Sequence, residues 1–171
     1  MEIERKFLVK AFPENPERFP YHEIVQGYLC RHPAVRVRRE DDQYYMTYKG
    51  LRQAGQIGQE EYNLPLSKEA FDHLLAKADG RLIEKRRVLI PLNADAFSHA
   101  ANADAASWAA SGEGQIELDV FSGEFEGLQI AEVEFPSEEI AAAYHPADWF
   151  GREVTGDEHY SNAWLALSER N

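Results

Sequence analysis

Charged side chains in this sequence recur in pairs whose members are separated by one residue. That spacing places both members on one face of a β-strand, because side chains alternate between its two faces. One such pair is more often a solvated strand face than a functional site. Five pairs in 171 residues favour a sheet whose charged faces share an enclosed interior. The pairs are Glu2 and Glu4, Arg36 and Arg38, Lys85 and Arg87, Glu117 and Asp119, and Glu132 and Glu134.

Charges enclosed in the interior of a sheet must be neutralised, which restricts the ligands that the interior can bind. Two like charges about 4 Å apart repel by roughly 4 kcal/mol at an effective dielectric of 20, so clustered carboxylates need protons or cations. Carboxylate oxygens are hard ligands that suit Mg²⁺ or Mn²⁺. Clustered arginines and lysines need a polyanion, and their donors match phosphate oxygens. A metal–carboxylate wall facing a cationic wall is what phosphoryl transfer from a polyphosphate requires.

Period-two alternation and turn residues predict the strands that position these side chains. We expect eight strands, at 2–9, 24–30, 35–40, 44–49, 57–66, 81–92, 115–121 and 128–135. Eight strands suffice to close a barrel around side chains or one small ligand. The expected fold is α+β and mainly β: an eight-stranded antiparallel closed β-barrel with helices packed outside.

Helices are expected where capping residues precede apolar residues at helical spacing. Ser67 and Ser137 are the expected N-caps, Gly80 is expected to end the first helix, and 160–168 could form the last. The Ala-, Ser- and Asp-rich segment 93–114 is interpreted as an inserted loop with room for a short helix. We expect one domain over 1–171.

Composition excludes several classes of protein. Hydrophobic residues make up 44% of the chain, which excludes disorder, and the net charge of −12 disfavours nucleic acid and anionic membranes as partners. One cysteine fits a reducing compartment, and we expect a cytoplasmic protein with no membrane span.

These motifs resemble the CYTH domain family, the triphosphate tunnel metalloenzymes. Glu2-Ile3-Glu4-Arg5-Lys6 matches the ExExK signature of that family. The later motifs follow in the family's order and span nearly the whole chain: Arg36/Arg38, Tyr48-Lys49-Gly50, Lys85/Arg87 and Ala131-Glu132-Val133-Glu134-Phe135. The resemblance implies a tunnel that hydrolyses triphosphate groups with a divalent metal.

The resemblance also implies roles for individual residues. The implied metal ligands are Glu2, Glu4, Glu61, Glu132 and Glu134. The implied phosphate-binding residues are Lys6, Arg36, Arg38, Lys49, Lys85 and Arg87. Gln26-Gly27-Tyr28-Leu29 resembles a segment of short bacterial members in which a Lys–Tyr pair is proposed as catalytic, here Lys85 with Tyr28. Segment 93–114 is longer than the family's usual connection, and His159 stands where relatives often carry arginine.

The resemblance therefore predicts a Mg²⁺- or Mn²⁺-dependent triphosphatase that splits inorganic tripolyphosphate into diphosphate and phosphate. Within the family, the alternative is a thiamine or nucleoside triphosphatase or an adenylate cyclase. In that case Phe97 and Trp108 could fold over the tunnel mouth and provide the aromatic platform for the organic group. A noncatalytic polyphosphate-binding module is the alternative from another class. Two carboxylate pairs disfavour it, because binding alone needs the basic wall but no metal. The expected partner is a small triphosphate. Whether two copies of the chain form a homodimer is left open.

Overall fold

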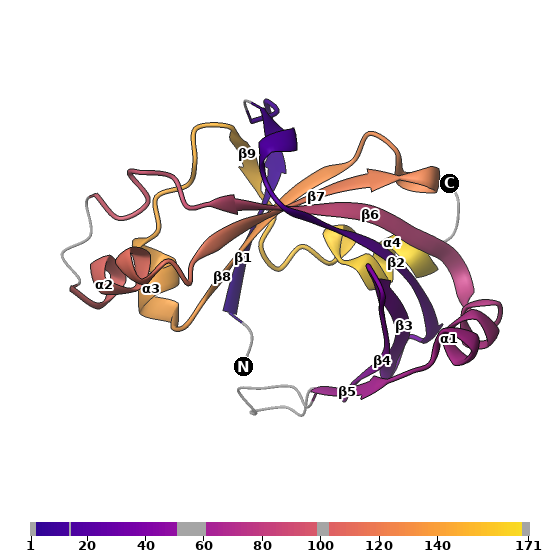
Figure 1. Ribbon diagram of the computed structural model, residues 1–171. Coiled ribbons are helices and arrows are strands. Elements are labelled where there is room, and N and C mark those ends of the chain that lie inside the picture. The colour runs from indigo at the N-terminus through magenta and orange to yellow at the C-terminus, as the bar shows by residue number, and fades with distance from the viewer. Residues whose placement is uncertain (1–2, 14, 51–60, 99–102, 169–171) are drawn as a thin grey trace.

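The computed structural model describes residues 3–13, 15–50, 61–98 and 103–168. These residues form one antiparallel sheet of nine strands in the order β5-β4-β3-β2-β6-β7-β8-β1-β9 (Figure 1). The strands are β1 (Ile3–Val9), β2 (Tyr21–Cys30), β3 (Ala34–Glu40), β4 (Gln43–Lys49), β5 (Glu61–Pro65), β6 (Asp79–Pro91), β7 (Gln115–Ser122), β8 (Gln129–Phe135) and β9 (Phe150–Glu153). The predicted Glu2 and positions 57–60 of the fifth strand lie outside the described residues.

The prediction of a closed eight-stranded barrel is wrong. The sheet is open: it curves around a concave face, and β5 and β9 are its two edges among the described residues (Figure 1). The strand β9 was not predicted, since its four residues include Gly151 and show no alternation of apolar and polar side chains. It pairs with β1 at Phe7 and Val9. Closure depends on strand tilt and stagger accumulated over the whole sheet, which alternation within single strands does not specify.

The two predicted helix caps are confirmed. The Ser67 side chain accepts a hydrogen bond from the Ala70 backbone at the start of α1 (Lys68–Leu75). Ser137 accepts one from Ile140 at the start of α3 (Glu138–Ala143). Gly80 does not end α1, which stops at Leu75, but lies in β6 with a φ of 68°.

The convex face of the sheet carries the larger hydrophobic core. Phe7, Leu118 and Val133 are among its fully buried side chains, beside α3 and α2 (Ala103–Ser111). Segment 93–114 thus contains a helix. Its Trp108 packs on Phe97 and Phe135, with ring centroids 6.0 and 5.6 Å apart. Both aromatic residues therefore belong to the convex core.

One helix packs on the concave face, so the prediction that all helices lie outside the sheet is wrong. Leu165 and Ala166 of α4 (Asn162–Leu167) pack in a second hydrophobic core, at one end of the concave face of the sheet. Their buried neighbours there are Tyr28, Ile83, Phe121 and Ile130. Arg81 secures the helix by donating to the Leu165 carbonyl at 2.6 Å. None of the described helices is long and apolar enough to cross a membrane.

Candidate active site

The concave face holds a cavity of about 370 Å³ lined mainly by charged and polar side chains. Alternation along each strand brings these side chains to the same face, as the charged pairs predicted. In the described parts of the chain, the residues that line it are Glu4, Lys6, Tyr28, Ala34, Arg36, Arg38, Tyr45, Thr47, Lys49, Glu61, Asn63, Arg87, Glu132, Glu134, Ser161, Asn162 and Ala163.

Strands β1 and β8 form the acidic wall of the cavity. Their antiparallel register places Glu4 opposite Glu134 and Lys6 opposite Glu132. The Lys6 Nζ lies 3.0 Å from Glu132 Oε1 and 3.4 Å from Glu4 Oε1. Burial lowers the pKa of Lys6, but the two carboxylates raise it more, so the net shift is upward and the amine is charged.

Beneath this wall, Asp119 on β7 binds two cations from β6. Its Oδ2 accepts from Lys85 Nζ at 2.5 Å, and Arg87 donates to both carboxylate oxygens at 2.7 and 2.8 Å. Arg87 also forms ion pairs with Glu117 and with Glu132. The residues Glu117 and Asp119 therefore hold basic side chains in place.

Burial and paired charges act in opposite directions on the pKa values of this layer. Burial lowers the pKa of Lys85 to about 8, although Asp119 opposes the shift. Burial would raise the pKa of Asp119, yet Lys85 and Arg87 bring it down to about 2. For Glu132, burial and Asp119 raise the pKa, but the cations Lys85, Lys6 and Arg87 leave it below its ordinary value.

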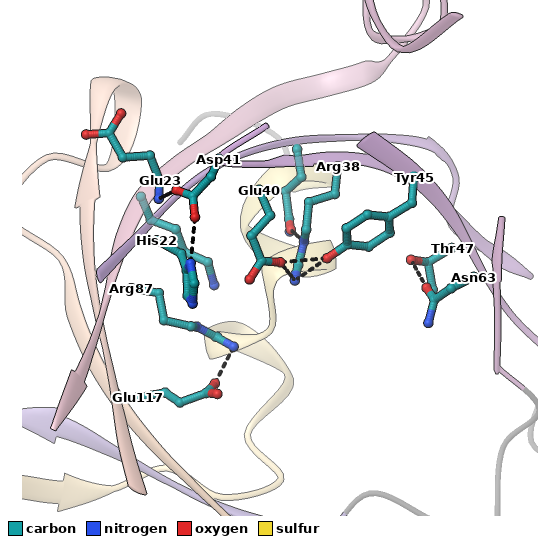
Figure 2. Close-up of polar contacts among 12 residues, drawn as sticks. His22, Glu23, Arg38, Glu40, Asp41, Tyr45, Thr47, Asn63, Arg87 and Glu117 are labelled. Carbon is teal, nitrogen blue, oxygen red and sulfur yellow. Dashed lines mark hydrogen bonds and ion pairs between the residues drawn. The ribbon is translucent and has the colours of Figure 1, made fainter. Parts of the chain in front are cut away.

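Strands β3 and β4 form the basic wall with Arg36, Arg38 and Lys49. Figure 2 shows Arg38 reaching the Tyr45 hydroxyl, which itself donates to Glu40 at 2.7 Å. The Nε of Arg38 donates to the buried Gln26 side chain at 2.8 Å. These contacts fix the plane of the Arg38 guanidinium at the cavity wall.

Glu61 is described at the start of the edge strand β5, where it lies opposite Lys49. Its carboxylate pairs with Lys49 Nζ at 3.0 Å. Burial raises the pKa of Glu61, but the contacts with Lys49 outweigh it and the net shift is downward. Next to it, Thr47 donates to Asn63 at 2.7 Å (Figure 2).

The structure does not bring Tyr28 and Lys85 together in register. Lys85 lies opposite Ile24 on β2, whereas Tyr28 lies four residues further along that strand, opposite Asp79. At about 3.3 Å per residue the two positions are roughly 13 Å apart along the strand. Tyr28 lines the cavity, while the fully buried Lys85 lies outside its lining.

The donor set fits a hard cation chemically. Glu4, Glu132 and Glu134 supply carboxylate oxygens to one cavity, and the Lys6 ammonium already lies between two of them as a stand-in cation. In the parts of the chain that the structure describes, no three acidic, histidine or cysteine side chains are grouped closely enough to hold a metal. To hold a divalent metal, these carboxylates must therefore move closer together around the position that the Lys6 amine now occupies.

Sequence reasoning missed several residues of the lining. Asn63 follows Glu61 at period two and could have been found by extending the alternation along β5. The residues Ser161 and Asn162 carried no such signal, because they reach the cavity through the packing of α4. His159 does not line the cavity; it bonds Asp157 at 2.8 Å and remains largely exposed.

Comparison with known proteins gives matches over nearly the whole chain. A family model described as the CYTH domain matches residues 1–153. An inorganic triphosphatase of Nitrosomonas europaea is 36% identical over 173 residues, covering 98% of this chain and 97% of the relative. An inorganic triphosphatase of Acetivibrio thermocellus is 34% identical over 170 residues, covering 96% and 92%. The crystal structure of an inorganic triphosphatase matches with a TM-score of 0.71 at 34% identity, over 100% of this chain and 97% of that one.

Proposed function

Because this chain belongs to the CYTH domain family, we propose that it is an inorganic triphosphatase, which hydrolyses tripolyphosphate to diphosphate and phosphate. The family match confirms the resemblance predicted from the motifs, and the predicted enzyme class agrees with the names of both curated relatives. The observation that carries the proposal is one cavity that brings together Glu4, Glu132 and Glu134 from β1 and β8 and Arg36, Arg38 and Lys49 from β3 and β4.

Charge balance supports a divalent cation as part of the reaction. Among the described residues, five cationic side chains and four carboxylates line the cavity: Lys6, Arg36, Arg38, Lys49 and Arg87 against Glu4, Glu61, Glu132 and Glu134. Such a nearly neutral set cannot by itself offset a polyanionic triphosphate. Mg²⁺ or Mn²⁺ would add the missing positive charge, and Glu4, Glu132 and Glu134 would hold it, with Glu61 and the undescribed Glu2 as further candidates.

The chain's own cations then bind and orient the substrate. Arg36, Arg38 and Lys49 would grip phosphate oxygens, and Arg38 does so with its guanidinium plane already fixed by Gln26 and Tyr45. Arg87 would stabilise charge on the transferred group from the floor of the cavity. Bound metal would supply polarisation of a phosphate oxygen and activation of water.

Phosphate release from tripolyphosphate tests the proposal. We expect activity to vanish with chelator and to return with Mg²⁺ or Mn²⁺. Glu4→Ala and Glu132→Ala should each abolish turnover, while Glu23→Ala, whose carboxylate pairs with Arg86 at an exposed site, should not. Tight binding of tripolyphosphate without phosphate release under any metal would point instead to the noncatalytic binding module.

The catalytic roles of Lys85 and Tyr28 stay a prediction with its own test. A lysine whose pKa is about 8 gains its neutral, proton-accepting form as the pH rises through that value. If Lys85 is the general base, kcat should rise into the alkaline range, and Lys85→Ala and Tyr28→Phe should lower kcat more than they raise KM. An unchanged kcat and pH profile in Lys85→Ala would favour water activated by the metal.

A further inference from the structure

Glu4 and Glu132, which are proposed to hold metal, already contact cationic side chains of the protein. Both oxygens of Glu132 are occupied, Oε1 by Lys6 Nζ at 3.0 Å and Oε2 by Arg87 Nη2 at 2.9 Å. Glu4 also contacts the Lys6 amine at 3.4 Å. The side chains of Lys6 and Glu132 are only 12% and 10% exposed, so water screens this ion pair weakly. Each carboxylate oxygen has a second lone pair, but a divalent cation bound there would lie beside two positive charges, so its binding favours the departure of one of the two side chains.

Arg87 is poorly placed to leave. Asp119 holds it through two hydrogen bonds of 2.7 and 2.8 Å, and Glu117 pairs with its remaining Nη1. Its planar guanidinium would break several of these contacts at once if it turned. Lys6, in contrast, carries a point charge on a flexible stem, and the carboxylates that hold it are the proposed metal ligands themselves.

We propose that Lys6 is an internal counter-cation: its amine neutralises Glu4 and Glu132 until a divalent cation displaces it toward the substrate phosphates. The inference rests on the proposed function and assigns Lys6 a second role beside phosphate binding. Lys6 lines the same cavity as Arg36 and Arg38, so the displaced amine stays within the phosphate-binding space. Metal binding and triphosphate binding are then positively coupled, and each strengthens the other by the same factor.

Calorimetric titration of Mn²⁺ into the whole chain, without any phosphate compound, tests this role. Lys6→Met removes the competing charge and keeps the length of the stem. We expect it to bind Mn²⁺ at least tenfold more tightly than the wild type. Arg36→Met is the matched control, because it removes one positive charge from the same cavity without vacating Glu4 or Glu132. We expect less than a threefold change there.

Lys6→Met removes the amine that contacts Glu4 and Glu132 and can therefore lower stability, so thermal unfolding gives a second readout. Saturating Mn²⁺ should raise the Tm of Lys6→Met, and of Lys6→Gln, by more than it raises the wild-type Tm. Unchanged or weaker Mn²⁺ binding by the Lys6 variants overturns the inference. So does an equal gain in Arg36→Met, which would show a general effect of cavity charge. A wild type that neither binds Mn²⁺ nor releases phosphate would overturn the proposed function and this inference with it.

Discussion

Asp119 bonds Lys85 and Arg87 at once from a position that is 1% exposed. Asp119→Asn would leave the buried Lys85 without its counter-charge and would weaken the contacts of Arg87, which keeps its ion pairs with Glu117 and Glu132. Breaking a buried pair in this way costs about 3–5 kcal/mol, and we expect that loss of unfolding free energy at pH 7 in urea titrations. Asp72→Asn, at an exposed pair with Lys68, should stay within about 0.5 kcal/mol of the wild type.

The pH dependence of Asp119 has a definite sign. Its pKa in the folded protein, about 2, lies below the ordinary 3.8, because Lys85 and Arg87 outweigh the opposing effect of burial. A lowered carboxyl pKa gives stability that is complete above the unfolded value and is lost as the pH falls through the folded one. The difference in unfolding free energy between wild type and Asp119→Asn should therefore shrink between about pH 4 and pH 2. A constant difference over that range would contradict these contacts.

Which residues face the cavity could be predicted from the sequence, but their partners could not. Arg36, Arg38 and Glu134 line the cavity because period two fixes the face of each side chain on its strand. The pairing of Lys6 with Glu132 depends on the register between β1 and β8, which are more than a hundred residues apart in sequence. No pattern within either strand specifies that register.

At the scale of elements, Gly80 lets α4 approach β6. A Cβ there would lie 2.1 Å from the Ala166 carbonyl oxygen, and the φ of 68° is unfavourable for any other residue. Gly112 provides a matched control, because its φ is 75° but no atom lies within 4 Å of an added Cβ. Gly112→Ala should thus cost only the backbone strain, about 1–2 kcal/mol.

Gly80→Ala should cost more than that control. We expect about 1–3 kcal/mol of further destabilisation from overpacking against α4, seen as a lower unfolding free energy. Hydrogen exchange should also quicken in α4 but not in α3. Equal costs for the two alanine variants would show that α4 does not need this close approach. The sequence did not predict that Gly80 lets α4 approach β6, because a glycine after an apolar helical segment is typical of a helix C-cap.

For the molecule as a whole, the arrangement of aromatic side chains bears on substrate choice. Phe97 and Trp108, which could have covered the cavity in a family member acting on organic triphosphates, pack against Phe135 and Tyr144 in the convex core. In the described part of the lining the aromatic residues are Tyr28 and Tyr45. Tyr45 is tied to Glu40 and Arg38, and Tyr28 is 4% exposed within the core beneath α4.

This arrangement favours a bare polyphosphate over an organic one. Stacking on an aromatic side chain is worth about 1–3 kcal/mol per base in single-strand binders, but Tyr28 is buried and the Tyr45 hydroxyl is held by Arg38 and Glu40. The arginines and lysines grip the phosphates of every triphosphate alike, so they cannot restore that affinity. We therefore expect kcat/KM for tripolyphosphate to exceed the values for ATP and thiamine triphosphate by more than tenfold. Side-by-side measurement of the three kcat/KM values with Mg²⁺ and with Mn²⁺ tests this expectation, and an organic triphosphate that equals tripolyphosphate would contradict it.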